Sequence, residues 1–239
     1  MMRQLLLASI LWLGISEAIP AEPKPGTYIL AKGSGTLEIR RDANNRLVFK
    51  IETIGGNSHT CSPSGTIEGA VGQTDDDIPE FQCRIAFEQN GSAVDVQPLT
   101  DDACSSHCGV RASFDGTYRM PPASCTHSGR NKQRATFLGL YRAKRYAEAA
   151  KVIDALARQC DDFMNWIEID RLRNDLALSQ HHNGDADQCL ATLKTTFAGT
   201  VAEEDELRDN LPPSEFLNYL SVAKATWFNQ KLCAKGRSR

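Results

Sequence analysis

The chain has 239 residues, with 27 lysines and arginines, 30 aspartates and glutamates and a formal net charge of −3 at pH 7. This near balance excludes a strongly basic nucleic-acid-binding protein. The charge is uneven, because residues 19–125 hold 9 basic and 14 acidic side chains and residues 126–239 hold 17 and 15. We expect no nucleic-acid partner for either part, whereas the acidic first part tolerates a cationic partner.

The N-terminus has the pattern of a cleavable export signal, predicted at residues 1–18. A short positive segment, residues 1–4, precedes the apolar stretch 5–15, which has the length of a signal-peptide core and is too short to span a bilayer. Small residues at the −3 and −1 positions predict cleavage after Ala18, with Ala21 as a second choice. Because no later stretch is long and apolar enough for a span, we expect a periplasmic or secreted chain without membrane insertion after cleavage.

Eight cysteines follow this segment. An even number of cysteines in an exported chain predicts a disulfide framework, although eight cysteines allow 105 full pairings. Five precede residue 126 and three follow it, so complete pairing requires at least one bridge between the two parts, with Cys125 as the natural candidate. The eight positions are Cys61, Cys83, Cys104, Cys108, Cys125, Cys160, Cys189 and Cys233.

Residues 26–118 have the period-two pattern of antiparallel strands. A first hairpin is predicted around the polar turn 42–45. A second is predicted at Asn90-Gly91, a strong two-residue turn signal, which would place Phe87 opposite Val94 and Ile85 opposite Val96. The apolar positions that flank the first turn are Leu37, Ile39, Leu47, Phe49 and Ile51.

The spacing of these segments predicts six to eight short strands. We therefore expect an N-terminal antiparallel β sandwich or small barrel at residues 19–125. Cys83 lies on the buried face of the second hairpin, and Cys61 lies on an earlier strand, so Cys61–Cys83 is the preferred local bridge.

The pattern becomes helical after Pro121-Pro122 and a polar linker predicted at 126–131. A stack of antiparallel helical hairpins is predicted for residues 126–239, which makes the whole chain an α+β protein. Asp185 is predicted to cap the fourth helix. The helices are expected at 132–142, 146–160, 163–182, from 186 onward, and from 212 to about 236. Their aromatic residues, Phe163, Trp166, Phe216 and Trp227, are expected to pack in the core, with a concave ligand groove lined by them as the alternative.

Two helical segments look related. Residues 146–153 align with residues 186–193 at an offset of 40, and Gly184-Asp185 opens the second copy. This pattern resembles the tetratricopeptide repeat, in which a Gly-Asp turn precedes a small residue packed between paired helices, although the usual offset is about 34. The resemblance implies a helical surface that holds a peptide or a subunit. Unrelated antiparallel helices around one core remain the alternative.

The β part is similar in layout to the stapled β domains of bacterial lysozyme inhibitors and of immunity proteins that neutralise cell-wall-degrading toxins. The likeness is architectural. The inhibitors' Ser-Gly-x-x-Tyr loop is absent, because Asp115-Gly116-Thr117-Tyr118 is one residue shorter and lacks the serine. The resemblance therefore implies an inhibitory binding protein without assigning any residue to inhibition.

Several short motifs have a chemical interpretation and a simpler one. Cys104, His107 and Cys108, with Cys125 and His127, have the residue types of a zinc or copper(I) site, but disulfides are expected to consume the thiols. Ser221-x-x-Lys224 matches a serine-nucleophile spacing that helix surfaces often produce by chance. The acidic runs 75–77 and 203–206 lack the spacing of a calcium loop and are interpreted as solvated loops.

These observations favour an exported binding or inhibitory protein over an enzyme. We expect another exported or envelope protein as its partner, and we expect no cofactor, metal ion or catalytic residue. An envelope scaffold that uses the helical hairpins is the first alternative. A secreted enzyme of unrecognised type is the second.

Overall fold

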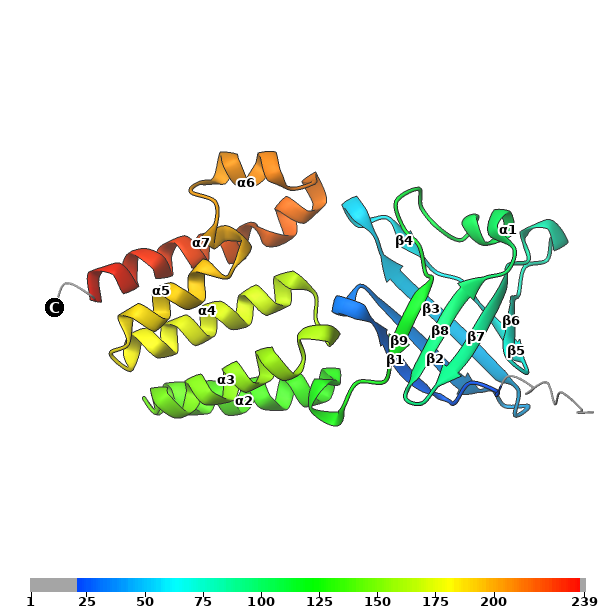
Figure 1. Cartoon of the computed structure of the whole chain (residues 1–239), viewed down its shortest axis with the longest axis horizontal. Coiled ribbons are helices and arrows are strands. Elements are labelled where there is room, and N and C mark those ends of the chain that lie inside the picture. The colour runs from blue at the N-terminus through cyan, green and yellow to red at the C-terminus, as the bar shows by residue number, and fades with distance from the viewer. Residues whose placement is uncertain (1–20, 237–239) are drawn as a thin grey trace, which may run out of the picture.

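The computed structural model describes residues 21–236, which form a β lobe followed by a helical lobe. Figure 1 shows the two lobes side by side along the longest axis of the molecule. The predicted signal segment 1–18 lies outside the described residues. Among residues 21–236, every helix is too short or too polar to cross a membrane.

The β lobe is an antiparallel barrel, which decides between the two predicted architectures. Eight strands close the ring in the order β2-β1-β9-β8-β7-β6-β5-β3, and β3 pairs with β2 at the seam. The ninth strand, β4, pairs with one end of β3. The strands are β1 Gly26–Leu30, β2 Gly35–Arg41, β3 Leu47–Ile54, β4 Thr60–Cys61, β5 Ser64–Glu68, β6 Val71–Thr74, β7 Arg84–Asn90, β8 Ala93–Pro98 and β9 Gly116–Arg119.

The first predicted hairpin is confirmed. β2 pairs with β3 so that Leu37 lies opposite Ile51 and Ile39 lies opposite Phe49. All four side chains are buried, because alternate residues of both strands point into the barrel. Tyr28, Phe87 and Tyr118 fill the same interior. The barrel is therefore packed with side chains, and its binding surfaces have to lie outside it.

The second hairpin forms, but its predicted register is wrong by two residues. Phe87 lies opposite Val96, and Ile85 lies opposite Pro98. The loop consists of Gly91 and Ser92, with Gly91 at a φ of 63°. A positive φ at the first loop position suits a type II′ turn, so the glycine occupies that position. The predicted face survives because a shift of two residues preserves the alternation.

The preferred Cys61–Cys83 bridge is wrong. Cys61 pairs with Cys108 and Cys83 pairs with Cys104, so both barrel cysteines bond to the segment between β8 and β9. That segment contains the short helix α1 Asp101–Ser105. Cys61 and Cys83 do lie inside the barrel core, as the period-two pattern predicts. Their partners come from the connection that covers one end of the barrel.

The helical lobe contains two hairpins, α2 with α3 and α4 with α5, followed by α6 and α7. Thr126 caps α2 by accepting a hydrogen bond from the amide of Gly129, so the predicted linker 126–131 is wrong and forms the start of a helix. Asp185 caps α5 as predicted. The helices are α2 His127–Arg142, α3 Tyr146–Gln159, α4 Trp166–His182, α5 Ala186–Lys194, α6 Glu204–Asn210 and α7 Pro213–Gly236.

Disulfides brace the helical lobe internally. Cys125 pairs with Cys160, and Cys189 pairs with Cys233. Cys125 thus bonds to a cysteine of the helical segment, as expected from the count. However, Cys125 packs in the core of the helices, so this bridge does not tie the barrel to them. The two lobes are joined by the chain and by non-covalent contacts.

Candidate functional site

Two contacts hold the lobes together. At the first, the β1–β2 loop meets the segment before α4, and Gly33 lies so close that an added Cβ would sit 2.7 Å from the Asn165 amide nitrogen. At the second, the Ser214 hydroxyl at the start of α7 lies 3.2 Å from the Asn57 side-chain oxygen of the β3–β4 loop. These contacts hold the two loops against the first turns of α4 and α7.

Charged side chains surround the first contact. Lys32 pairs with Asp161 and lies 3.4 Å from Asp162, which also lies 3.5 Å from Arg119 of β9. The Asp161 carboxylate raises the pKa of Lys32. All four groups are exposed, so each pair contributes at most about 1 kcal/mol. The close packing at Gly33 is therefore the more specific part of this contact.

A cleft of about 670 Å³ lies between the two contacts. Barrel loops form one wall and the starts of α4 and α7 form the other. Its apolar side chains include Ile54 and Trp166, which are 65% and 36% exposed, respectively. Glu215, Asn218 and Arg173 are polar residues that also line it. Apolar side chains together with a few polar groups are the usual composition of a binding site.

The barrel wall of the cleft is made of strained loops. Five described residues other than glycine have a positive φ, and Lys32, Asn57 and Ser58 belong to the two loops at the lobe contacts. The left-handed conformation costs a residue with a Cβ about 1–2 kcal/mol. Such residues concentrate at functional sites, where the surrounding structure holds them in place. Their gathering here supports a functional role for the cleft.

Trp166 is held in the helical wall by aromatic packing. Its ring centroid lies 4.6 Å from that of Tyr219 and 5.6 Å from that of Phe197. Burial raises the pKa of Tyr219, so its hydroxyl stays protonated and donates to the Asp170 carboxylate at 2.7 Å. The core was the predicted place for Trp166, but one part of its ring is exposed in the cleft. The side chain is thus a fixed apolar contact surface.

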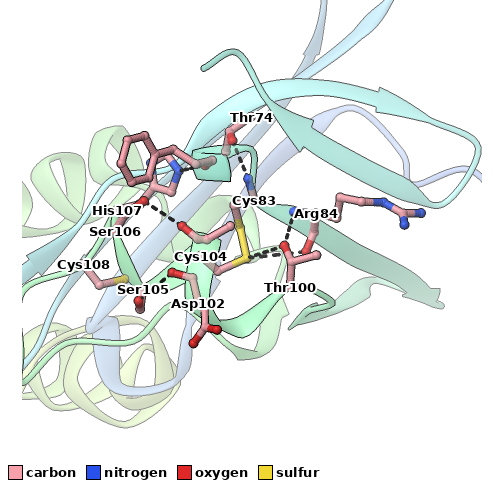
Figure 2. The surroundings of a disulfide bond; sticks show 12 residues. Thr74, Cys83, Arg84, Thr100, Asp102, Cys104, Ser105, Ser106, His107 and Cys108 are labelled. Atoms are coloured by element: carbon pink, nitrogen blue, oxygen red, sulfur yellow. Dashed lines mark hydrogen bonds between the residues drawn. A yellow bond between two sulfur atoms is a disulfide. The ribbon is translucent and has the colours of Figure 1, made fainter. Parts of the chain in front are cut away.

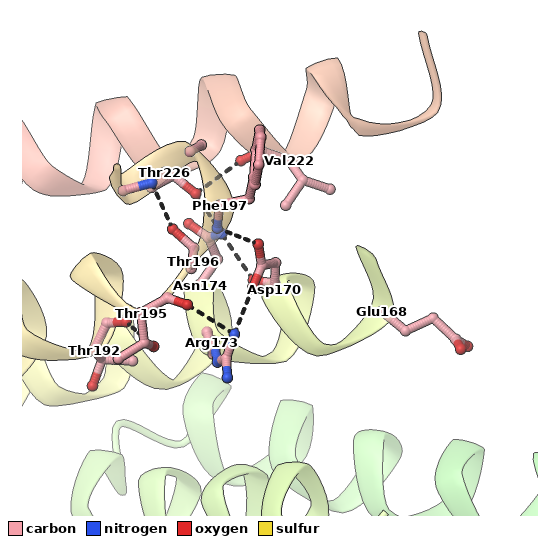
Figure 3. A network of polar contacts seen from close by, with 12 residues as sticks. Glu168, Asp170, Arg173, Asn174, Thr192, Thr195, Thr196, Phe197, Val222 and Thr226 are labelled. Atoms are coloured by element: carbon pink, nitrogen blue, oxygen red, sulfur yellow. Dashed lines mark hydrogen bonds and ion pairs between the residues drawn. The ribbon is translucent and has the colours of Figure 1, made fainter. Parts of the chain in front are cut away.

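Asp170 of α4 is the centre of a buried network of polar contacts, shown in Figure 3. Its side chain is 2% exposed, and its carboxylate accepts from the Phe197 amide at 2.8 Å and from Arg173 at 2.9 Å. These bonds join α4 to the segment before α6 and, through Tyr219, to α7. A buried carboxylate with three donors is well satisfied.

The buried polar network continues along α4 and α7. The Asn174 side chain donates to the Thr226 hydroxyl at 2.9 Å and accepts from Asn229 at 2.9 Å. These amide and hydroxyl groups fix the register of α7 against α4, because any slip would leave buried donors unpaired. The two helices that form the helical wall therefore present their first turns as one rigid unit.

Of the residues singled out from the sequence, only Trp166 lines this site. The eight cysteines are all in disulfides. The two histidines of the metal-like motif contact other side chains: His107 lies 3.2 Å from Asp76, and His127 forms a hydrogen bond with Asn131. Within residues 21–236 there is no cluster of histidine, cysteine and carboxylate groups that could hold a metal ion. Lys224 of the serine-lysine motif lies 3.1 Å from Glu204. The interpretation of the acidic run 203–206 as a loop is wrong, because α6 begins at Glu204.

The other cleft residues were missed because the cleft is built from four separate segments. Lys32-Gly33 and Gly55-Gly56-Asn57-Ser58 are local turn signals, but a sequence does not indicate what a turn faces. Asn165-x-x-Glu168 is a capping box that correctly marks the start of α4 and thereby the position of Trp166. That signal was available and would have shortened the predicted helix 163–182.

The chain was compared with protein families, curated proteins and solved structures, and none of them matches it.

Proposed function

We propose that the chain is an exported, periplasmic binding protein of the inhibitor or immunity type, which holds a segment of another exported or envelope protein in the interdomain cleft. The observation that carries this proposal is the pair of exposed apolar side chains, Ile54 and Trp166, that face one cleft from two rigid walls.

The size of the cleft and its composition support a protein segment as the ligand. Covering a largely exposed isoleucine and a tryptophan edge is worth about 2–4 kcal/mol. Tryptophan is also among the residues that dominate binding energy at protein interfaces. Because both walls are fixed by internal bonds, little additional ordering is required on binding.

The disulfides support an oxidising compartment. Four bridges use every cysteine of the chain, and such bridges persist in the periplasm or outside the cell. Together with the signal pattern predicted at residues 1–18, they favour the periplasm.

A second candidate function is an envelope scaffold. It is favoured by a groove of about 770 Å³ along α3, α4 and α5, which is separate from most of the cleft and includes the exposed Ala191. In this alternative, the helical hairpins hold a subunit as the tetratricopeptide-like pattern implies.

Affinity capture from an envelope extract tests the proposal and separates the candidates. Ile54→Arg places a charge in the cleft, Ala191→Arg fills the helical groove, and Phe228→Arg is a control because Phe228 is 66% exposed on α7. We expect one protein to be recovered stoichiometrically with the wild type, Ala191→Arg and Phe228→Arg but not with Ile54→Arg.

Other outcomes would contradict the proposal that the cleft binds the partner. Loss of the partner with Ala191→Arg alone would favour the scaffold, and equal recovery with all variants would place binding elsewhere. Turnover of a cell-wall substrate by the purified protein would replace the binding proposal with an enzyme.

A further inference from the structure

A second surface of the barrel has exposed apolar side chains. We define the α1 surface as α1, the β6–β7 connection 75–82, the adjoining residues Pro98 and Leu99 and the loop 109–115. Figure 1 places α1 at the rim of the barrel. The exposed fractions are 51% for Ile78, 48% for Phe81, 50% for Leu99 and 97% for Val110. The cleft does not account for these side chains.

A disulfide and several hydrogen bonds join α1 to the end of the β6–β7 connection, as Figure 2 shows. Cys104 of α1 is bonded to Cys83, whose amide donates to the Thr74 hydroxyl at 2.8 Å. A nitrogen of His107 lies 3.2 Å from the carbonyl oxygen of Phe81 and 3.2 Å from the Asp76 carboxylate. The apolar side chains are therefore presented on a braced framework, which lowers the entropic cost of binding.

The surface is strongly acidic. The segments that form it contain seven aspartates and glutamates and one basic side chain, Arg111. Within the described chain, several exposed carboxylates of this surface form no ion pair with a basic residue. These are Asp75, Asp77, Glu80, Asp101, Asp102 and Asp115. Unpaired charges of one sign around exposed apolar groups attract a surface of opposite sign.

A pocket of about 410 Å³ opens on this surface between α1 and the loop 109–115. Pro98, Val110 and Phe114 supply apolar walls, while Asp101 and Asp115 supply carboxylates. A lysine or arginine side chain has a matching composition, because its aliphatic stem packs on apolar groups and its charged end bonds to carboxylates. We call this hollow the α1 pocket.

We propose that the α1 surface docks a cationic protein, with one lysine or arginine side chain of that protein entering the α1 pocket. This inference rests on the proposed function in one respect, namely that the ligand is a protein. The loop 109–115 also adjoins the cleft, since the Gly56 amide donates to the Arg111 carbonyl at 3.1 Å. One partner can therefore contact both sites.

Calorimetric titration with a hexa-arginine peptide tests the charge and the pocket, with hexaglutamate as the opposite probe. Asp101→Asn/Asp115→Asn removes both pocket carboxylates. Glu68→Gln/Glu88→Gln removes the same charge from exposed barrel positions outside the α1 surface. We expect hexa-arginine to bind the wild type and the Glu68/Glu88 variant, and to bind the Asp101/Asp115 variant roughly tenfold more weakly. Hexaglutamate is expected not to bind.

The contradicting results are defined by the same titrations. Equal weakening in both double variants would show attraction to net charge without a pocket, and absence of hexa-arginine binding would also overturn the inference. Ile54→Ser is expected to leave this binding unchanged. If partner capture depends on Ile54 but hexa-arginine does not bind, the α1 inference fails and the proposed function stands.

Discussion

The barrel and the helical lobe bury different kinds of groups. The barrel core is almost entirely apolar, and its two disulfides tie the connection around α1 to the strands. The helical lobe contains most of the buried polar side chains described, including Asp170, Asn174 and Asn229. Closed hydrogen bonding between strands fixes the barrel without such groups, whereas helices can slide past one another unless specific polar bonds set their register.

The barrel loops at the cleft are held by backbone hydrogen bonds, such as that from the Gly55 amide to the His59 carbonyl, whereas the helical wall is held by buried side chains. The cleft combines both, because the strained loops at Lys32 and Asn57 face the wall that Asp170 organises. The following variants test how independent the two lobes are.

The largest effect is expected from removing one disulfide in each lobe. By chain entropy, the loss of Cys125–Cys160 or of Cys83–Cys104 lowers the free energy of unfolding by about 3–4 kcal/mol. Both described tryptophans, Trp166 and Trp227, lie in the helical lobe. We expect Cys125→Ser/Cys160→Ser to shift the tryptophan fluorescence transition, and Cys83→Ser/Cys104→Ser to speed amide exchange in the barrel. Equal shifts of the fluorescence transition would show that both lobes unfold together.

The next effect concerns the buried network. Asp170→Ala leaves the Phe197 amide, the Tyr219 hydroxyl and Arg173 without their acceptor, and should destabilise the helical lobe by about 3 kcal/mol. Chemical denaturation followed by tryptophan fluorescence measures the change. Asp209→Ala, an exposed control in α6, should change stability by less than about 0.5 kcal/mol. Similar effects of the two variants would refute the stabilising role of the network.

A smaller effect is expected at the contact between the lobes. Gly33 has a φ of 62°, and Gly33→Ala adds a Cβ that would clash with the backbone of Asn165. Gly69→Ala is a matched control, because Gly69 has a φ of 61° and open space around it. Both variants carry the left-handed penalty of about 1 kcal/mol. Only Gly33→Ala should also change the small-angle scattering profile, since it pushes the lobes apart; identical profiles would contradict the packing described.

The smallest effect is a pH dependence confined to the helical lobe. Burial and the neighbouring His181 lower the pKa of His182, which stacks on Tyr146. The unfolded chain therefore binds more protons, so this group's contribution to stability is present above about pH 6.5 and is lost as the pH falls. We expect the melting temperature to fall less between pH 7 and pH 5 in His182→Gln than in the wild type. An equal fall in melting temperature in His182→Gln and in the wild type would exclude His182 as the source of the pH dependence.

Local patterns in the sequence predicted much of the fold. Alternation at Leu37 and Ile39 gave the first hairpin, and the helical periods gave the hairpin stack. The register at Asn90-Gly91-Ser92 was not decided locally, because either pair can form the turn while the same face stays buried. The bridge partners of Cys61 and Cys83 depend on barrel closure, which brings the α1 segment over one end of the ring.

The candidate site was less predictable than the fold. Ile54 reads as one more residue of a strand, and Trp166 as one more core aromatic of a helix. Both side chains are exposed in one cleft because the contacts of Gly33 and Asn57 hold the barrel against the helices. These contacts belong to the tertiary structure and leave no local pattern in the sequence. Acidity around α1 is visible in the sequence, but the pocket formed with the loop 109–115 is not.

Site-specific photocrosslinking tests the central claim, that the interdomain cleft binds a protein partner, most directly. A photoreactive phenylalanine analogue is placed at Ile54, and at Leu138, 39% exposed on α2, as the control. After irradiation in an envelope extract, we predict one discrete crosslinked protein from position 54 and none from position 138. The same crosslinked protein from both positions, or none from position 54, would contradict the account.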